Sequence, residues 1–227
     1  MNKYDIVRKI EKFAPLETQE KWDCSGWGVD SHNPIKNNEV QKILFALTVT
    51  DKIVQQAREK ECDMIISHHP LFYVPLSWKN INIYCAHTNL DKAEGGTTDT
   101  LIKELGFVKT VSYEFVRIVE LESVINVEEL KQKLLKISPK LRCINNYDKK
   151  EIRTIAFCAG SGSEFIDEYD TDAFVTGDLK FHTALDCKNI VFDIGHFESE
   201  IFAPKILKEI TQVGDNGVIA IEKSPFI

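Results

Sequence analysis

The stretch KILFALTVTDKIVQQAREKECDMIISHHP, residues 42–70, decides the fold class. It opens with an apolar, β-prone run, continues with the periodicity of an amphipathic helix, and ends in a second short apolar run. The order strand, helix, strand is typical of an α/β protein, in which helices flank a sheet. The second strand runs into two adjacent histidines, and Pro70 then stops regular structure.

The same alternation of strands and helices extends along the whole chain. Strands are predicted at 42–49, 62–67, 81–86, 114–121, 152–158, 172–176, 189–194 and 217–222, and helices at 3–13, 51–61, 97–106, 127–137, 163–169, 179–187 and 198–211. Asn126 is a favourable N-cap for the helix at 127–137, and Glu129 is placed to close a capping box.

An internal repeat relates the two halves of the chain. ILFALTVT, DKIVQQAREKE and CDMIISHHP in the first half correspond to TIAFCAGSGS, EFIDEY and TDAFVTGDLKFH in the second. In the units that follow, each half has a strand, a histidine and a carboxylate four residues later: His87 with Asp91, and His196 with Glu200. Any two α/β halves share an element order, but the matched spacing is harder to obtain by chance.

We therefore predict two pseudo-equivalent α/β halves, residues 1–111 and 112–227, with mixed sheets flanked by helices and strand ends that meet. The linking region, 112–150, shows less similarity between the halves, and the run Asn145–Asp148 is typical of a turn.

The composition excludes several classes of protein. Hydrophobic residues are 43% and charged residues 28% of the chain, as in ordinary globular proteins. The net charge of −7, without a Lys/Arg-rich stripe, argues against nucleic-acid binding. No apolar run is long enough for a membrane span, and the N-terminus has the pattern of an amphipathic helix. The six scattered cysteines contain no CxxC pair, which indicates reduced thiols and a cytoplasmic protein.

Five of the six histidines lie at or just beyond a predicted strand end, where open α/β folds bind their ligands. His32 is the exception and is interpreted as a loop residue without a role. If a helix begins near Gly195, His196 and Glu200 are one turn apart on one face. That spacing suits two ligands of one metal ion or a carboxylate that bridges two ions, although the spacing alone favours a hydrogen bond at a solvated helix end. Glu198 points to a different side of this helix.

His87 and Asp91 have the same spacing, but HTNLDKAEGG is turn-rich and is expected to be non-helical. The two side chains can reach one pocket, or Asp91 can simply orient His87. Adjacent His68 and His69 would point to opposite faces of a continuing strand. Where the strand ends, their imidazoles can splay toward two ions, and burying both rings is costly unless each has a partner.

Three or four imidazoles and two carboxylates are enough donors for two ions and generous for one. A dinuclear centre is therefore the sharper hypothesis.

The motifs resemble the family of GTP cyclohydrolase I type 2 homologues, also called Ngg-interacting-factor-three-like dinuclear metal proteins. The resemblance spans nearly the whole chain, through APLETQEKWDCSGWGVD, CDMIISHHPLFY, YCAHTNLDKAEGGTTDTLIKELG, CAGSGSEFI, DAFVTGDLKFHTALD and DIGHFESE in this order. It implies that two divalent metal ions are bound by His68, His69, Asp91, His196 and Glu200.

The resemblance also implies two linked α/β halves with the metal site between them, and a homo-oligomer, commonly a toroidal hexamer. It places His87 and the TGD stretch, Thr176–Asp178, in the lining of the pocket, with WDCSGW (residues 22–27) closing one side. We assign His87 as the candidate catalytic residue, either a proton shuttle or a group that orients a metal ligand.

The first functional hypothesis is a metal-dependent hydrolase acting on a nucleotide, a cyclic amide or a phosphoester, since paired ions activate water and polarise substrate oxygens. The alternative is a non-catalytic protein for metal delivery, storage or regulatory interaction. AGSGSE, residues 159–164, is either a phosphate-binding turn or a tight strand-to-helix turn. Imidazole and carboxylate donors suit Zn, Fe, Mn, Co or Ni about equally well. Cys85, on the strand before His87, can tune the site or belong to the core.

Overall fold

The computed structural model describes residues 1–31 and 38–226, so that His32 and its expected loop lie outside the described residues. The chain forms two compact units, Met1–Ala93 together with Ala203–Ile227, and Glu94–Phe202. Among the described residues, no helix combines the length and apolar character needed to cross a membrane.

The first unit is built on a five-stranded sheet in the order β1-β4-β3-β2-β11. Strands β2, β3 and β4 are parallel neighbours, β11 joins β2 in parallel, and β1 pairs antiparallel with β4. The elements are α1 (Lys3–Phe13), η1 (Leu16–Thr18), β1 (Gly26–Val29), β2 (Ile43–Ala46), α2 (Asp51–Glu59), β3 (Met64–Ser67), η2 (Leu76–Trp78), β4 (Asn82–Cys85), α3 (Thr88–Lys92), α8 (Ala203–Thr211), η4 (Gly214–Asn216) and β11 (Gly217–Ile219).

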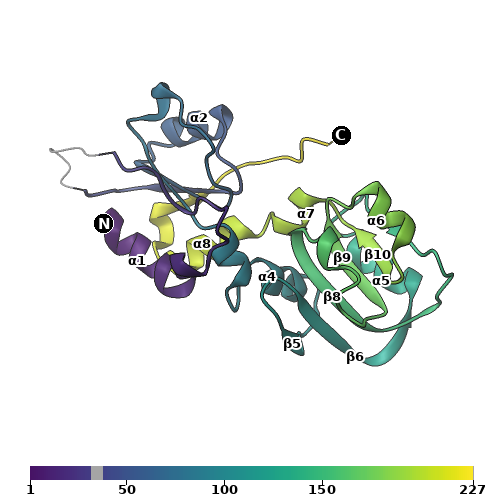
Figure 1. The fold of residues 1–227 in the computed structure, drawn as a ribbon. Helices are drawn as coiled ribbons and strands as arrows, with labels where there is room; N and C mark the ends of the chain where they lie inside the picture. The colour runs from purple at the N-terminus through teal and green to yellow at the C-terminus, as the bar shows by residue number, and fades with distance from the viewer. Residues whose placement is uncertain (32–37, 227) are drawn as a thin grey trace. The chain divides into compact units, whose positions relative to one another are not determined.

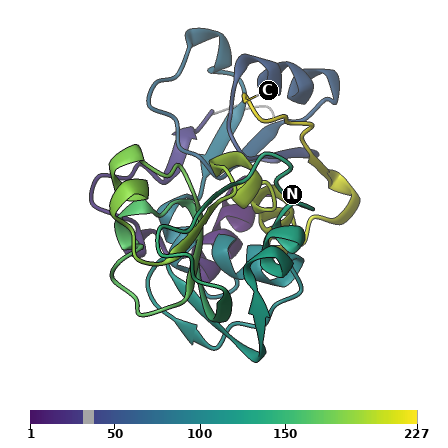
Figure 2. The same cartoon turned by 90° about the vertical axis from the view of Figure 1, so that its right-hand side faces the viewer.

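Helices cover both faces of this sheet, because its central strands are apolar on both sides. Phe45 and Ile66 pack with buried residues of α1 and α8, whereas Leu44 and Ile65, one residue away along the strands, pack with buried residues of α2. In Figures 1 and 2, α2 accordingly lies on the face opposite α1 and α8.

The second unit is built on a six-stranded sheet in the order β5-β6-β8-β9-β10-β7. Strands β8, β9 and β10 are parallel neighbours, and β6 and β7 pair antiparallel with β8 and β10. The elements are α4 (Thr97–Glu104), β5 (Val111–Ser112), β6 (Arg117–Asn126), α5 (Val127–Leu134), β7 (Arg142–Ile144), β8 (Glu151–Ser161), η3 (Ser163–Phe165), β9 (Ala173–Gly177), α6 (Phe181–Asp186), β10 (Ile190–Asp193) and α7 (His196–Glu200).

The two units share a core topology. Each has three parallel strands that follow one another in the sheet, and in each the third strand has an antiparallel edge partner. In each unit a short helix follows that third strand, α3 after β4 and α7 after β10. The predicted α/β class, with two mixed sheets flanked by helices, is confirmed.

The extents of the units differ from the predicted halves, 1–111 and 112–227. Residues of α4 pack into the core of the second unit, beside Phe157 and Val175. The C-terminal segment instead completes the first sheet, since Val218 of β11 pairs with Leu44 of β2. Pairing between strands so far apart in sequence is not visible in local patterns.

Local predictions at the helix ends have mixed outcomes. The capping box is present, with Asn126 Oδ1 accepting from the Glu129 amide and Glu129 Oε2 accepting from the Asn126 amide. The expected helix at 163–169 is only the short turn η3, and a segment of that length is marginal as an α-helix. The helix expected at 198–211 is split into α7 and α8, because Pro204 in the first turn of α8 disfavours helical structure before it.

Candidate metal centre

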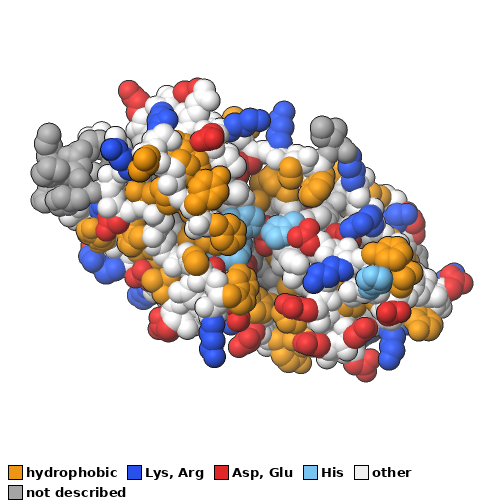
Figure 3. Space-filling view, turned by 45° about the horizontal axis from the view of Figure 1, so that its top comes forward, with side chains coloured by type: hydrophobic (Ala, Val, Ile, Leu, Met, Phe, Trp, Pro, Cys, Tyr) orange, Lys and Arg blue, Asp and Glu red, His pale blue; other side chains and the backbone are white. Residues whose placement is uncertain are grey.

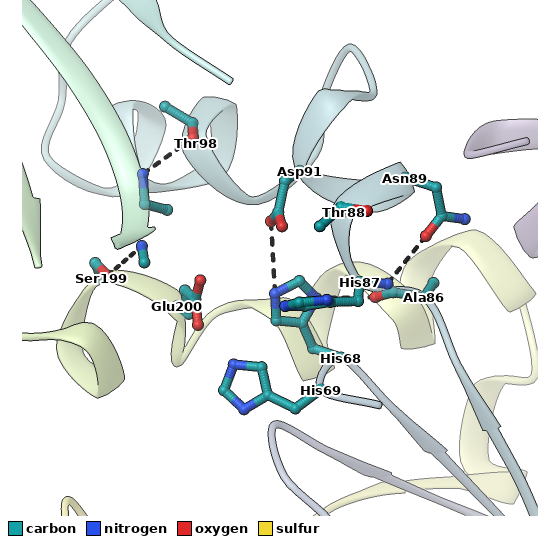
Figure 4. Close-up of polar contacts among 12 residues, drawn as sticks. His68, His69, Ala86, His87, Thr88, Asn89, Asp91, Thr98, Ser199 and Glu200 are labelled. Atoms are coloured by element: carbon teal, nitrogen blue, oxygen red, sulfur yellow. Dashed lines mark hydrogen bonds and ion pairs between the residues drawn. The ribbon is translucent and has the colours of Figure 1, made fainter. Parts of the chain in front are cut away.

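Three imidazoles gather at one edge of the first sheet. His68 and His69 directly follow β3, and His87 follows the neighbouring parallel strand β4. Each ring offers one nitrogen, and these three nitrogens all lie within 4.8 Å of one another. Figure 4 shows the three rings side by side, with centroids 5.1 Å apart for His68 and His69 and 5.2 Å for His68 and His87.

Backbone hydrogen bonds explain how adjacent histidines can share one side. The amides of His68 and His69 donate to the carbonyls of Ala46 and Leu47, at 3.2 and 2.9 Å, just beyond the end of β3. Pro70 has no amide to continue this ladder. The regular strand ends at Ser67, so His68 and His69 do not follow the alternation of a strand, and their ring nitrogens lie in one group.

Each of the three rings is held through Nδ1. The Nδ1 atoms of His68, His69 and His87 lie 2.9 Å from the Ala86 carbonyl oxygen, 2.6 Å from the Thr48 hydroxyl and 3.0 Å from Asp23 Oδ1. A carbonyl or carboxylate oxygen only accepts, so Nδ1 of His68 and of His87 carries the proton. Their Nε2 atoms then present a lone pair, which is the tautomer that binds a metal ion.

Asp91 adds a carboxylate to this group. It lies in α3, one helical turn after His87, and its Oδ1 is 3.5 Å from Nε2 of His68. The expectation that this segment is not helical is wrong. His87 begins the turn, and its carbonyl accepts from the amides of Leu90 and Asp91. The short helix fixes the direction of the Asp91 side chain, which is largely buried.

Asp23, from the WDCSGW segment, holds the His87 ring and the start of α3 in place through hydrogen bonds. Its Oδ1 contacts His87, and its Oδ2 accepts from the amide and hydroxyl of Thr88. Burial disfavours the charge of Asp23, but the hydrogen bonds from Thr88 and His87 outweigh it and bring the pKa of Asp23 to about 2. The carboxylate is therefore ionised at neutral pH and holds the Nδ1 proton of His87.

In the second unit, His196 and Glu200 form the predicted pair. Helix α7 begins at His196 after Gly195, and the two side chains meet one turn apart, with Nε2 2.9 Å from Glu200 Oε2. Glu198, the competing carboxylate, is directed elsewhere. A Cβ atom at Gly195 would lie 2.4 Å from its Oε2. The helical spacing thus selects Glu200, as the sequence indicates.

His196 is also held through Nδ1, which lies 2.7 Å from Oδ2 of Asp178. Burial opposes the charge of the His196 ring, but the hydrogen bonds and charges of Glu200 and Asp178 raise its pKa to about 9. The ring therefore lies between two carboxylates, one at each nitrogen.

Two glycines of the repeat motifs make room for this pair. At Gly160 a Cβ atom would lie 2.2 Å from Glu200 Oε1, and at Gly177 it would lie 2.6 Å from the His196 amide nitrogen. A side chain at Gly177 would therefore collide with the backbone of α7, and one at Gly160 would displace the Glu200 carboxylate.

The AGSGSE segment contains the end of β8, at Ser161, and the start of η3, at Ser163, so it is a tight connection between a strand and a helical turn. The amide of Gly160 donates to the Ser199 hydroxyl, and the amide of Gly162 donates to the Thr176 hydroxyl, both at 2.9 Å. These amides already have partners within the unit, so the structure favours the turn interpretation over a phosphate-binding loop.

The donor types fit a divalent transition metal. Imidazoles held through Nδ1 and carboxylates are common ligands of Zn, Fe, Mn, Co and Ni. Cys85 is buried, which raises the pKa of its thiol to about 12, and its Sγ lies 3.4 Å from the Cys24 carbonyl oxygen. Cys85 is therefore a core residue and not a thiolate ligand.

Some partners of the site were not expected from the sequence. Thr48 and Asp23 contact His69 and His87 but are 21 and 64 residues away from them in the chain. His182, which the repeat places at a strand end, lies instead on the exposed helix α6 beside Phe181.

The two mixed sheets and the grouped imidazole and carboxylate donors define an α/β protein with candidate metal-binding groups. The profile of the family described as Duf34/NIF3 (NGG1p interacting factor 3) matches residues 1–225, and the chain belongs to this family.

Similar proteins cover nearly the same length. The chain is 32% identical to a GTP cyclohydrolase 1 type 2 homolog of Clostridium perfringens, over 86% of each chain. It is 28% identical to the homolog of that name in Campylobacter jejuni, over 98% of this chain and 97% of the relative. A hypothetical protein of Staphylococcus aureus has the same fold, with a TM-score of 0.82, 23% identity and coverage of 100% and 99%.

Proposed function

We propose that the chain binds two divalent metal ions through His68, His69 and Asp91 of the first unit and His196 and Glu200 of the second. The observation that carries this proposal is that His68, His69 and His196 are each held through Nδ1, while carboxylate oxygens of Asp91 and Glu200 lie 3.5 and 2.9 Å from the Nε2 atoms of His68 and His196. The number of donors supports two ions rather than one. Elemental analysis of protein purified without a chelating tag tests the proposal, and less than one ion per chain argues against it.

The reaction proposed is metal-dependent hydrolysis. Paired divalent ions, when bound, supply Lewis acidity and lower the pKa of water. His87 is the candidate proton shuttle: Asp23 keeps the proton on Nδ1, so that Nε2 can accept one from a reacting group and return it. The exposed Trp22 ring makes an edge contact with the His87 ring, with centroids 6.1 Å apart, and so adds an aromatic surface beside this histidine.

The substrate class proposed is a nucleotide, a cyclic amide or a phosphoester. Its support is the name GTP cyclohydrolase 1 type 2 homolog carried by the bacterial relatives. A panel of these compounds, assayed with metal-loaded protein, is expected to give turnover that His69→Ala abolishes. His87→Gln is expected to lower kcat while leaving the metal content unchanged. His182→Ala, on the exposed helix α6, is the control and should retain full activity.

The alternative is a metal-handling or regulatory interaction protein without turnover. The family description supports this alternative, because the description names an interacting factor and no reaction. A protein of this kind would exchange ions with an acceptor chelator or partner while converting no compound of the panel. Turnover that depends on His87 would decide for the hydrolase.

Self-association as a toroidal hexamer is proposed from an apolar segment on the first unit. Phe72, Tyr73 and Leu76 are 90%, 78% and 85% exposed, and hydrophobic side chains gather on the surface of this unit (Figure 3). Exposed apolar side chains in one short segment are typical of a protein interface. Light scattering should give six chains per particle, and Phe72→Glu with Leu76→Glu should reduce this number. The six free thiols support a cytoplasmic location.

A further inference from the structure

Asp178 has a backbone conformation that few residues other than glycine adopt. Its φ angle is 52°, in the left-handed region, where a side chain other than that of glycine is disfavoured. The preceding Gly177 ends β9, and the position after the strand would accommodate glycine more easily than aspartate. An aspartate in a conformation that favours glycine suggests that its carboxylate has a function.

Neighbouring side chains fix this conformation from both sides. The hydroxyl of Ser163 donates to the Asp178 carbonyl oxygen at 2.9 Å, and the following amide, that of Leu179, donates to Asp193 Oδ2 at 3.3 Å. Asp193 also accepts from the amide of Gly195 at 3.0 Å, and Arg142 pairs with its carboxylate. The buried Asp193 therefore connects the turn at Asp178 with the turn that starts α7.

The carboxylate of Asp178 is thereby directed toward the ring of His196. Oδ2 of Asp178 lies 2.7 Å from Nδ1 of His196, whose Nε2 faces Glu200. A carboxylate that accepts from one nitrogen of a ligand histidine orients the ring and makes the other nitrogen a stronger donor. Asp23 has the same relation to His87 in the first unit, at 3.0 Å.

We propose that Asp178 is a positioning residue for metal binding: it holds Nδ1 of His196 so that Nε2 is directed, with Glu200, toward a divalent cation. This inference rests on the proposed metal-binding function. It assigns to the aspartate of the TGD motif a role in affinity that is separate from ligation and from stability.

Asp178→Gly separates an effect on metal affinity from an effect on stability. It removes the carboxylate, and because glycine adopts a positive φ angle freely, it does not strain the backbone. Asp178→Asn keeps an acceptor of similar shape without the charge. Asp148 provides the matched control, since it is also an aspartate with φ 52°, and it lies in an exposed turn where its carboxylate pairs with Lys150. Asp148→Gly gives the same backbone relief and changes no residue of the site.

The experiment is a titration of metal-free full-length protein with Co²⁺, followed by its visible absorption and by competition with a chelator. Asp178→Gly is expected to weaken Co²⁺ binding about ten- to a hundredfold and to change the absorption spectrum. Its melting temperature without metal should stay close to that of the wild type. Asp178→Asn should lose less affinity than Asp178→Gly, and Asp148→Gly should lose none.

Wild-type affinity and spectrum in Asp178→Gly would overturn the role of Asp178 while leaving the metal centre in place. An equal loss in Asp148→Gly would overturn it too, because the cause would then be the backbone. If the wild-type protein binds no Co²⁺, both this inference and the proposed function fail.

Discussion

Nδ1 of His68 lies 2.9 Å from the backbone carbonyl oxygen of Ala86, at the ends of two neighbouring parallel strands. The acceptor is main chain, so the position of the His68 ring is set by the sheet itself. His68 is fully buried, whereas the adjacent His69 is partly exposed and contacts the side-chain hydroxyl of Thr48. Two neighbouring histidines are thus held by different means.

His68→Ala and His69→Ala are expected to differ in stability. His68→Ala leaves a cavity and a buried carbonyl without its donor, which should lower the free energy of unfolding of the metal-free protein by about 2–4 kcal/mol. His69→Ala should cost about 1 kcal/mol or less, since this side chain is partly exposed and the Thr48 hydroxyl can rotate to another hydrogen-bond partner. Urea unfolding of metal-free protein measures both values. Equal losses in the two variants would contradict this account.

Removal of metal is expected to destabilise the wild-type protein. An ion that binds only the folded chain adds about 4 kcal/mol when its free concentration is a thousandfold above Kd. A chelator should therefore lower the melting temperature of metal-loaded wild type. His69→Ala, which lacks a proposed ligand, should show a smaller shift. Identical shifts in the two proteins would speak against His69 as a ligand.

The stability of the protein should respond to acid through Asp23. The pKa of this carboxyl falls from 3.8 to about 2 in the folded chain, so the folded state holds the charge more strongly than the unfolded state. The resulting stabilisation is fully present above pH 3.8 and is lost as the pH falls through about 2. A shift of this size corresponds to about 2 kcal/mol, and the side chain is fully buried.

Asp23→Asn is therefore expected to be less stable than wild type at neutral pH, with the difference disappearing near pH 2. Denaturant unfolding of metal-free protein across pH 2–6 checks this. Asp186→Asn, at an exposed position of α6, is the control and should follow the wild-type curve. A pH-independent difference between wild type and Asp23→Asn would rule out this linkage.

Gly160 and Gly106 form a matched pair for testing the space around Glu200. Both have positive φ angles, +70° and +77°, but a Cβ atom at Gly106 would have no neighbour within 4 Å, whereas at Gly160 it would meet Glu200 Oε1. Gly106→Ala should cost about 1 kcal/mol from backbone strain alone. Gly160→Ala should cost about 1–3 kcal/mol more and should also weaken Co²⁺ binding, because Glu200 must move.

Urea unfolding and Co²⁺ titration of the two variants give this comparison. Full metal affinity in Gly160→Ala would show that Glu200 can shift without loss, and would weaken its assignment as a ligand.

The fold class and the main donor residues were accessible from sequence because they depend on local patterns. His68 and His196 each follow directly on a short apolar run. The spacing from His196 to Glu200 corresponds to one helical turn. Both side chains of that pair meet as predicted, at 2.9 Å. The assignment of the five ligands and of His87 as the catalytic residue remains a prediction.

The parts that the sequence did not reveal depend on long-range pairing. Asp23 reaches His87 only because β1 lies beside β4, and a single aspartate in a loop has no periodic signal. The helix α3 was missed because its turn-like composition outweighed a five-residue helix that the surrounding unit stabilises. The edge strand β1, with the sequence GWGV, alternates with glycines, and β7, with the sequence RCI, has only three residues, so neither contains a recognisable apolar run.

The pairing of β11 with β2 has a consequence for how the chain is made. During synthesis the second unit, Glu94–Phe202, is complete before α8 and β11 emerge from the ribosome. Until then β2 has an open edge, and the apolar face around Phe45 lacks its α8 cover. A nascent chain without α8 and β11 would therefore expose the unpaired edge of β2 and an apolar face of the sheet, both of which favour aggregation, so the first unit can close only after these two elements are made.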